Sequence, residues 1–284
     1  MGVLGIIIQT EFGLPLYIEM FDPKLEKFQQ MDMSLTAGFI TAINMFTKQY
    51  DMTLGHIKLH KNKEDVYGVN LIATKMGEYL ILCFVDPFTY HEIVREKIGW
   101  IYSRVLQKGS NITPERLRFD FSHTANLTDE EKVWIADTLQ DLYLKAMLAA
   151  NKENIDSLLG KFFLKYVGIH GISINSFDNS ILYFSGINEE IFRLVLNNIG
   201  RRSSIIKENE TVDSYVSIPS YPPVRVYAVN SGIKFQIQDI MTNLPEKIVS
   251  LYYYLIVDPD LNVRPIIVDL IEILDPFFSN LNDV

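Results

Sequence analysis

Residues 80–87 read LILCFVDP, and residues 252–259 read YYYLIVDP. Each stretch is an apolar run of strand length that ends in Asp-Pro, which predicts a buried strand followed directly by a helix. Aspartate is a favoured N-cap residue, and proline is tolerated at the first helical position because the N–H that it lacks has no partner there. The valines that precede the two Asp-Pro pairs are 257 − 85 = 172 residues apart, so the sequence predicts an internal repeat.

The elements predicted around these two stretches follow the same order in both halves of the chain. Each half begins with two strands and a helix, continues with further strands and ends with the helix after Asp-Pro. In the first half we expect strands at 3–9, 16–21, 55–60, 67–74 and 78–85, and helices at 32–50 and from residue 86. In the second half we expect strands at 171–176, 181–185, 215–218, 224–229, 234–240 and 249–257, and helices at 188–202 and from residue 258.

The segment between the halves is predicted to hold a polar connector and two helices. Residues 107–127 are polar and carry turn residues. Thr128 and Glu131 then form a capping-box pattern, which predicts a helix over 128–150. Apolar residues at helical spacing predict another helix over 155–166.

Composition favours a folded, non-membrane protein. The 284 residues are 48% hydrophobic and 21% charged, which is typical of globular domains, and the length suits two of them. The formal net charge is −9. Because proteins that bind nucleic acid present basic surfaces to the phosphates, this acidic balance predicts no nucleic-acid partner.

Cysteine usage and hydropathy predict the compartment. Cys83 is the one cysteine, and it lies within an apolar strand, so we expect a buried thiol and a reducing environment. No stretch approaches the roughly 20 apolar residues that span a membrane. We therefore expect a cytoplasmic protein whose contact with membranes is at most peripheral, through its partners.

Motifs that would indicate catalysis or metal binding are missing from the sequence. The chain contains no phosphate-binding P-loop, no dinucleotide-binding glycine pattern and no nucleophile elbow. His56 and His60 fall on a predicted strand, where residues four apart are separated by about 13 Å, too far to share an ion. We predict no catalytic residue, no cofactor and no metal. Lys58, Lys61 and Lys63 read as a solvated turn or as a contact for phospholipid head groups.

The helix predicted at 32–50 has an unusual outer face. It carries no charged residue from Met33 to Thr47, whereas a surface helix normally presents charges to water. Small residues and methionine there suit close approach of another chain or of the second domain. The residues assigned to this predicted partner-binding face are Ser34, Ala37, Gly38, Thr41, Met45 and Lys48.

The corresponding helix of the second half has a polar outer face. Arg193 and Asn197 lie there together with other polar residues. This pattern indicates either an ordinary solvated surface or a polar contact, and both residues are included in the predicted partner-binding set.

Three short stretches carry a resemblance to a known family. Residues 5–8 (GIII), 12–18 (FGLPLYI) and 35–43 (LTAGFITAI) resemble a longin domain over about residues 1–106. The second half, especially residues 158–184, looks like a roadblock domain or a second, diverged longin domain. Proteins of these families are mostly non-catalytic platforms that bind or regulate small GTPases.

The resemblance implies both a fold and a function. The implied fold class is α+β, with two profilin-like or longin-type domains that each hold a five-stranded, mainly antiparallel sheet covered by helices. The predicted domains are 1–110, a connector and helix at 111–150, and 151–284. The implied function is a non-catalytic platform for a small GTPase in membrane trafficking or signalling, with a homodimer or a related longin or roadblock protein as a further partner. The alternatives are a small-molecule sensor and an unrelated assembly scaffold.

Overall fold

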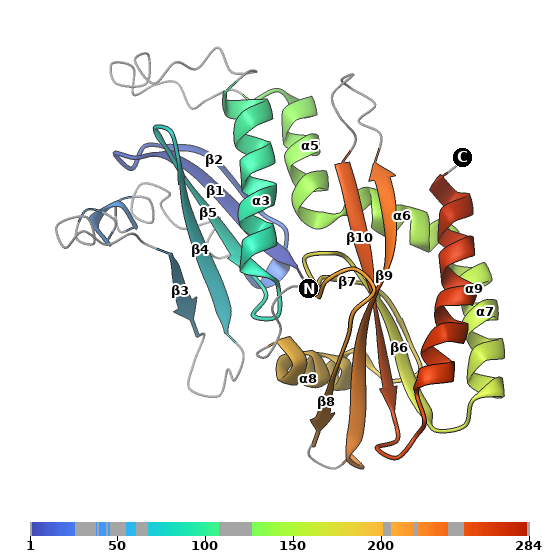
Figure 1. The fold of residues 1–284 in the computed structure, drawn as a ribbon. Coiled ribbons are helices and arrows are strands. Elements are labelled where there is room, and N and C mark those ends of the chain that lie inside the picture. The colour runs from blue at the N-terminus through green and yellow to red at the C-terminus, as the bar shows by residue number, and fades with distance from the viewer. Residues whose placement is uncertain are drawn as a thin grey trace. The chain divides into compact units, whose positions relative to one another are not determined.

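The computed structural model describes residues 2–25, 38, 40–43, 45, 55–60, 68–107, 127–200, 206–217, 221–237 and 247–282 (Figure 1). The chain divides into two compact units, Met1–Gln140 and Asp141–Val284. Each unit holds a five-stranded antiparallel sheet with helices, which confirms the predicted α+β fold class. The division falls inside the segment 111–150 that the sequence assigns to a connector and helix.

The first unit is built on a sheet with strand order β2-β1-β5-β4-β3, in which every neighbouring pair is antiparallel. Helices α3 and α5 pack against one face of this sheet. The strands are β1 (Val3–Thr10), β2 (Pro15–Met20), β3 (His56–Leu59), β4 (Val69–Met76) and β5 (Tyr79–Val85). The helical segments are η1 (Pro23–Leu25), α3 (His91–Ile101), η2 (Tyr102–Leu106) and α5 (Asp129–Gln140).

Strand β5 lies at the centre of the first sheet because it is apolar on both faces. All seven of its residues are buried, and successive side chains point to opposite faces of a strand. Ile81 and Cys83 pack with residues of α3 and α5, whereas Leu82 and Phe84 pack with Ile40 on the other face. Burial raises the pKa of the Cys83 thiol to about 12, so the predicted buried cysteine is confirmed.

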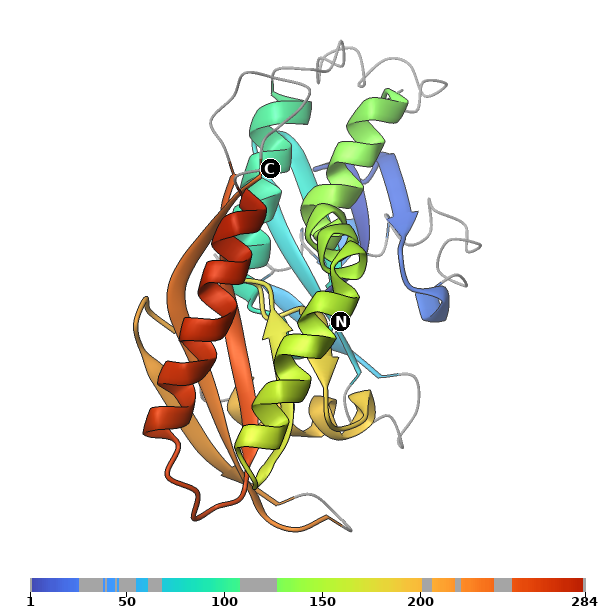
Figure 2. The same ribbon diagram turned by 90° about the vertical axis from the view of Figure 1, so that its right-hand side faces the viewer.

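The second unit repeats this sheet with the order β7-β6-β10-β9-β8. Helices α7 and α9 lie side by side on one face of the sheet and α8 lies on the other (Figure 2). The strands are β6 (Ile169–Asn175), β7 (Ile181–Ser185), β8 (Thr211–Val216), β9 (Val224–Ile237) and β10 (Lys247–Val257). The helices are α6 (Leu142–Ala150), α7 (Lys152–Lys165), α8 (Glu189–Gly200) and α9 (Arg264–Asn282).

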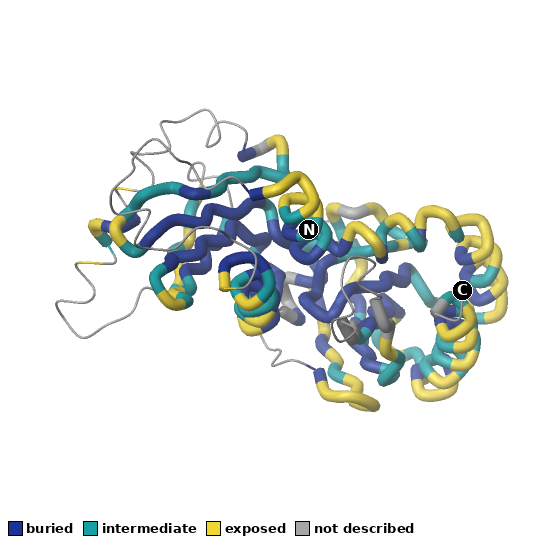
Figure 3. The backbone as a smooth tube through the Cα atoms, turned by 90° about the horizontal axis from the view of Figure 1, so that it is seen from above, coloured by how far each residue is buried: buried dark blue, intermediate teal, exposed yellow. Residues whose placement is uncertain are grey.

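The central strand of the second sheet, β10, is also buried on both faces. Residues 251–257 of β10 are all buried, and Figure 3 shows buried strands beside helices whose outer turns are exposed. The Lys165 ammonium and the Tyr166 hydroxyl both donate to the carboxylate of Asp269, which fastens the end of α7 to α9.

The two Asp-Pro pairs form turns and do not cap helices as predicted. The Asp86 carboxylate accepts from the backbone N–H of Phe88 at 3.1 Å, and α3 begins only at His91. The carbonyl of Asp258 accepts from the N–H of Leu261 at 3.2 Å, and α9 begins at Arg264. A turn therefore intervenes between strand and helix in both units.

Two other predicted elements differ from the structure. The strands predicted at 224–229 and 234–240 form one strand, β9 (Val224–Ile237), in which Gly232, between the two predicted segments, takes a φ of +87°. The capping box is confirmed, since the Glu131 N–H donates to Thr128 Oγ1 at 3.2 Å and the Thr128 N–H to the Glu131 carboxylate at 2.8 Å. The helix predicted over 128–150 is interrupted by Asp141, whose φ is +52°.

A half-buried carboxylate joins α9 to the sheet and predicts a pH dependence of stability. Asp275 Oδ1 accepts from the Tyr253 hydroxyl at 2.7 Å and from the Ser231 hydroxyl at 3.0 Å. Burial raises the pKa of Asp275 above its ordinary value, although these hydrogen bonds act in the opposite direction. The folded state therefore holds this proton more tightly than the unfolded chain, and the contribution of Asp275 to stability falls as the pH rises from about 4 through the folded pKa.

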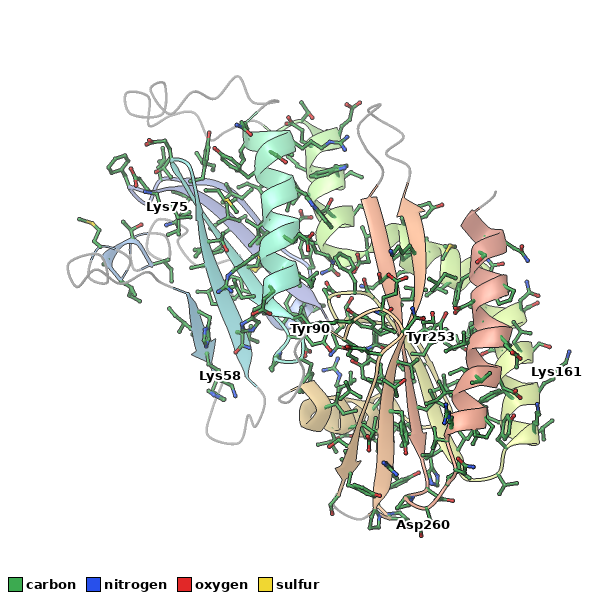
Figure 4. All side chains as sticks on the ribbon, viewed as in Figure 1. Lys58, Lys75, Tyr90, Lys161, Tyr253 and Asp260 are labelled. Atoms are coloured by element: carbon green, nitrogen blue, oxygen red, sulfur yellow. The ribbon has the colours of Figure 1, made fainter. Side chains whose placement is uncertain are left out.

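We expect Asp275→Asn to remove this slope, because the amide keeps an acceptor oxygen but carries no charge. The measurement is the free energy of unfolding in urea from pH 4 to pH 7, where the variant should gain on the parent as the pH rises. Asp260, which is exposed on the turn before α9 (Figure 4), gives the control variant Asp260→Asn. Parallel pH profiles for the parent and Asp275→Asn would contradict the assignment.

Candidate functional site

The predicted partner-binding face of the first unit is only partly exposed. Gly38 and Met45 lie at the surface, Met45 with 60% of its side chain exposed. Thr41 is buried, and its Oγ1 accepts from Gln9 Nε2 of β1 at 3.1 Å. The outward placement of Thr41 is wrong because the buried amide of Gln9 needs a polar partner on this helix. Ser34, Ala37 and Lys48 lie outside the described residues.

The polar residues predicted on the second helix lie on α8. Arg193 is half-buried there. Asn197 belongs to the same helix, and its side chain lies outside the described part of the structure. A partner-binding role for these two residues stays a prediction.

An exposed aromatic and arginine face lies on the edge of the second sheet, on strands β8 and β9. Tyr215 lies directly opposite Arg225 in the antiparallel register, and Asp213 lies opposite Tyr227. Directly opposed residues point to the same face of a sheet, so these four side chains form one surface. Tyr215 is 63% exposed. We call this set, Asp213, Tyr215, Arg225 and Tyr227, the tyrosine–arginine face.

The guanidinium of Arg225 is held over two aromatic rings. Its central carbon lies 4.9 Å from the ring centre of Tyr215 and 5.0 Å from that of Tyr227, both within cation–π range. Asp213 Oδ2 accepts from Arg225 Nε at 2.8 Å. This carboxylate raises the pKa of Arg225 above its ordinary value. The surface is therefore planar, aromatic and largely neutralised in charge.

A hollow of about 510 Å³ adjoins the tyrosine–arginine face. Thr211, Arg225 and Tyr227 line it from the sheet, and residues 261–264 together with Ile267 and Val268 line it from the start of α9. Arg264 is exposed at this rim. The arrangement offers flat π-surfaces and a guanidinium beside a concave apolar wall, which suits a planar heterocycle better than an extended peptide.

Sequence reasoning missed this face. The alternation of Tyr215 with buried neighbours, and of Arg225 with Tyr227, is visible as a period-two pattern. The pairing of the two strands brings the three side chains together, and that register does not follow from the alternation.

Within the described ranges, no group of three or more His, Cys, Asp or Glu side chains is placed to hold a metal ion. None of the helices described there is long and apolar enough to cross a membrane.

Comparisons with known proteins find local similarity to alanine–tRNA ligases. No family model matches the chain. Short segments are similar to alanine–tRNA ligases: 46% identity over 59 residues with the protein of Borrelia hermsii, 37% over 62 residues with that of Wolbachia pipientis, and 35% over 94 residues with that of Shewanella loihica. These segments cover 20%, 22% and 32% of this chain.

The matched segments are small parts of those ligases. The chain spans only 10%, 7% and 10% of the lengths of the three relatives, in the same order. The similarity is therefore local, and the activity of the whole ligases does not transfer with it.

These comparisons overturn the predicted function and partners. The expected role as a GTPase-regulating platform in trafficking is wrong, because the curated proteins similar to this chain are named for ligation to tRNA. The exclusion of nucleic acid is wrong for the same reason. The net charge of −9 does not by itself exclude nucleic acid, since a local surface can bind a base through aromatic rings regardless of the total charge.

Proposed function

We propose that this chain is a non-catalytic, tRNA-related RNA-binding protein, and that its tyrosine–arginine face receives unpaired bases. The similarity to alanine–tRNA ligases supplies the substrate class. The observation that carries the proposal is Arg225 lying about equally close to the rings of Tyr215 and Tyr227 on an exposed sheet edge. Single-stranded RNA is recognised in this manner, by stacking of bases on aromatic rings and on arginine planes.

The charge arrangement favours bases over phosphates at this face. Asp213 already neutralises Arg225 through a 2.8 Å ion pair and would repel a phosphate that approached the guanidinium directly. Arg264, at the rim of the adjoining hollow, is the cation best placed to meet the phosphate that follows a stacked base.

The proposed absence of catalysis is supported by the extent of the similarity. Matches of 59 to 94 residues cover a tenth or less of each of these ligases. The chain's own likeness to a longin domain is likewise a proposal. It is supported by the helical residues between β2 and β3 and by α8 between β7 and β8, since each sheet then has a helix inserted after its second strand.

Binding of a fluorescently labelled, alanine-accepting tRNA transcript, measured by anisotropy, tests the proposal. We expect the parent protein to bind, and Tyr215→Ala to weaken binding about fivefold to a hundredfold, because one stacked base contributes roughly 1–3 kcal/mol. An unlabelled single-stranded oligoribonucleotide should compete, whereas a blunt RNA duplex should not, since its bases are already stacked.

The matched control replaces a tyrosine of similar exposure elsewhere. Tyr143 on α6 is 48% exposed, and Tyr143→Ala should leave the affinity within about twofold, the scatter expected for a residue outside the contact. Equal loss in both variants, or no binding of tRNA at low salt, would refute the proposed face. Transfer of alanine to the tRNA by the parent protein would refute the non-catalytic assignment.

A further inference from the structure

A cluster of basic side chains lies on the edge strand β3 of the first unit. His56 and Lys58 are both exposed on β3, and alternation places them on the same face. Lys58 pairs in register with Asn70 of β4. The amide of Asn70 in turn lies 3.1 Å from His91 Nε2, at the start of α3.

The two imidazoles of this cluster face each other. The ring centres of His56 and His91 are 5.4 Å apart and the rings are tilted by 57°. His56 and His91 are 35 residues apart in sequence, and the fold brings their rings together. Arg95, one turn further along α3, has a terminal nitrogen 3.9 Å from the position that a Cβ on Gly55 would occupy, so its guanidinium reaches the start of β3.

The cluster carries an excess of positive charge. Among the residues that the structure describes, neither Lys58 nor Arg95 forms an ion pair. The pKa of His91 is held below its ordinary value, first by burial, then by His56, with Arg95 acting in the same direction and Glu92 against them. Glu92 is thus the one described acid that acts on His91, and it does not balance the cations.

We propose that His56, Lys58, His91 and Arg95 form a binding site for a phosphate group, and that its affinity increases as the pH falls. A phosphate dianion placed among these groups replaces mutual repulsion with charge-assisted hydrogen bonds. The Asn70 amide nitrogen donates to the neutral His91 ring at 3.1 Å, and with the amide turned by 180° its oxygen accepts from the charged ring. Two imidazoles, a lysine and an arginine from one edge strand and one helix supply donors on more than one side of the ligand.

The pH dependence follows from proton linkage. Near neutral pH, His91 is mostly uncharged because its pKa lies below the ordinary value. A bound phosphate favours the charged form of both imidazoles, so binding is coupled to proton uptake. Affinity therefore rises as the pH falls through the range between the pKa values of the occupied and empty site. The charges that face this pair are Lys58 from β3 and Glu92 and Arg95 from α3.

The test is a titration of the full chain with inorganic phosphate, followed by NMR of ¹⁵N-labelled histidine side chains. The chain has five histidines, so single substitutions assign every signal. We expect saturable shifts of the His56 and His91 resonances, and a rise in the apparent pKa of His91 on binding. Phosphate itself takes up a proton over this range, so affinities are compared per dianion, and the affinity for the dianion should be about tenfold higher at pH 5.5 than at pH 7.5 for one linked proton.

Variants separate the site from general surface charge. Lys58→Gln and His56→Gln alter exposed side chains and should each weaken phosphate binding about tenfold. Lys161, exposed on the outer side of α7 (Figure 4), gives the control Lys161→Gln, which should bind as the parent does. No saturable shift at pH 5.5, or equal affinities for Lys58→Gln and the parent, would overturn the proposal.

Competition identifies the source of the phosphate. A 5′-phosphorylated oligoribonucleotide is compared with its unphosphorylated form, and vesicles with phosphatidic acid are compared with vesicles of phosphatidylcholine. If one competitor displaces inorganic phosphate from the histidines, it identifies the source of the phosphate group. If neither the oligoribonucleotide nor the vesicles displace it, the ligand is a small phosphorylated molecule. The Tyr215→Ala variant should show the same histidine shifts as the parent, so the test of this phosphate site does not depend on the tyrosine–arginine face.

Discussion

Replacing Asn179 by alanine is expected to lower the free energy of unfolding by about 3 kcal/mol. Asn179 sits in the turn between β6 and β7 and is only 1% exposed. Its Oδ1 accepts from the Tyr254 hydroxyl at 2.7 Å and from Asn175 Nδ2 at 3.1 Å. Alanine takes this acceptor from the buried Tyr254 hydroxyl, at roughly 1–3 kcal/mol for a buried group that loses its partner, whereas Asn175 Nδ2 keeps its hydrogen bond to the Asn179 carbonyl at 3.2 Å.

The backbone of the same residue adds to the effect. Asn179 has a φ of +69°, in the left-handed region that asparagine tolerates and that costs alanine about 1 kcal/mol. Asn179→Gly therefore serves as the companion variant, since it loses the amide but not the backbone freedom. It should be about 1 kcal/mol more stable than Asn179→Ala.

Urea unfolding monitored by circular dichroism measures both variants. Tyr254→Phe completes a double-mutant cycle, because it removes the donor that Asn179 receives. The two substitutions should be less than additive by about 1 kcal/mol. Additive losses, or a change below about 1 kcal/mol for Asn179→Ala, would show that this buried turn is not stabilised by its amide network.

Substitution of Gly186 by alanine is expected to destabilise the second unit by about 3–5 kcal/mol. Gly186 follows β7 with a φ of +99°, a conformation that side chains rarely adopt. A Cβ there would lie 2.4 Å from the carbonyl oxygen of His170 and 2.8 Å from the Cα of Gly171, both backbone atoms of β6. Relief requires the β6–β7 pair to separate, so strain of about 1–3 kcal/mol adds to a similar overpacking cost.

A second glycine gives the matched control. Gly160 lies exposed in α7, and a Cβ built there meets nothing within 4 Å. Gly160→Ala should therefore raise stability by about 1 kcal/mol, the difference in helix propensity. Thermal and urea unfolding of both variants check the contrast. A Gly186→Ala protein as stable as the parent would show that the backbone at the end of β7 can shift without lowering the free energy of unfolding.

The fold was predictable where burial is continuous along the sequence. Strands β5 and β10 were located because both of their faces are apolar, and such runs leave few alternatives. The helix starts after them were misplaced because Asp-Pro suits a turn as well as an N-cap. In the structure, the Asp86 side chain accepts from the N–H of Phe88, two residues on, in the pattern of an Asx-turn.

The candidate sites were not predictable because strand pairing assembles them. Tyr215 and Arg225 meet across β8 and β9, and His56 reaches His91 through the packing of α3 beside β3. A one-residue change of register would turn each side chain to the other face. Thr41 was misplaced for a related reason. The apolar periodicity locates the buried side of the helix, but it does not show that Gln9 of β1 requires a polar partner on that side.

The position of β5 and β10 also determines how the nascent chain must behave on the ribosome. Each is the last strand of its sheet to be synthesised, yet each pairs with the first: Ile7 with Leu82, and Ser173 with Tyr254. At about 5–20 residues per second, roughly 4–16 seconds separate the emergence of the partners. During that interval the first hairpin of each sheet presents an unpaired apolar edge, which is open to pairing with the wrong strand.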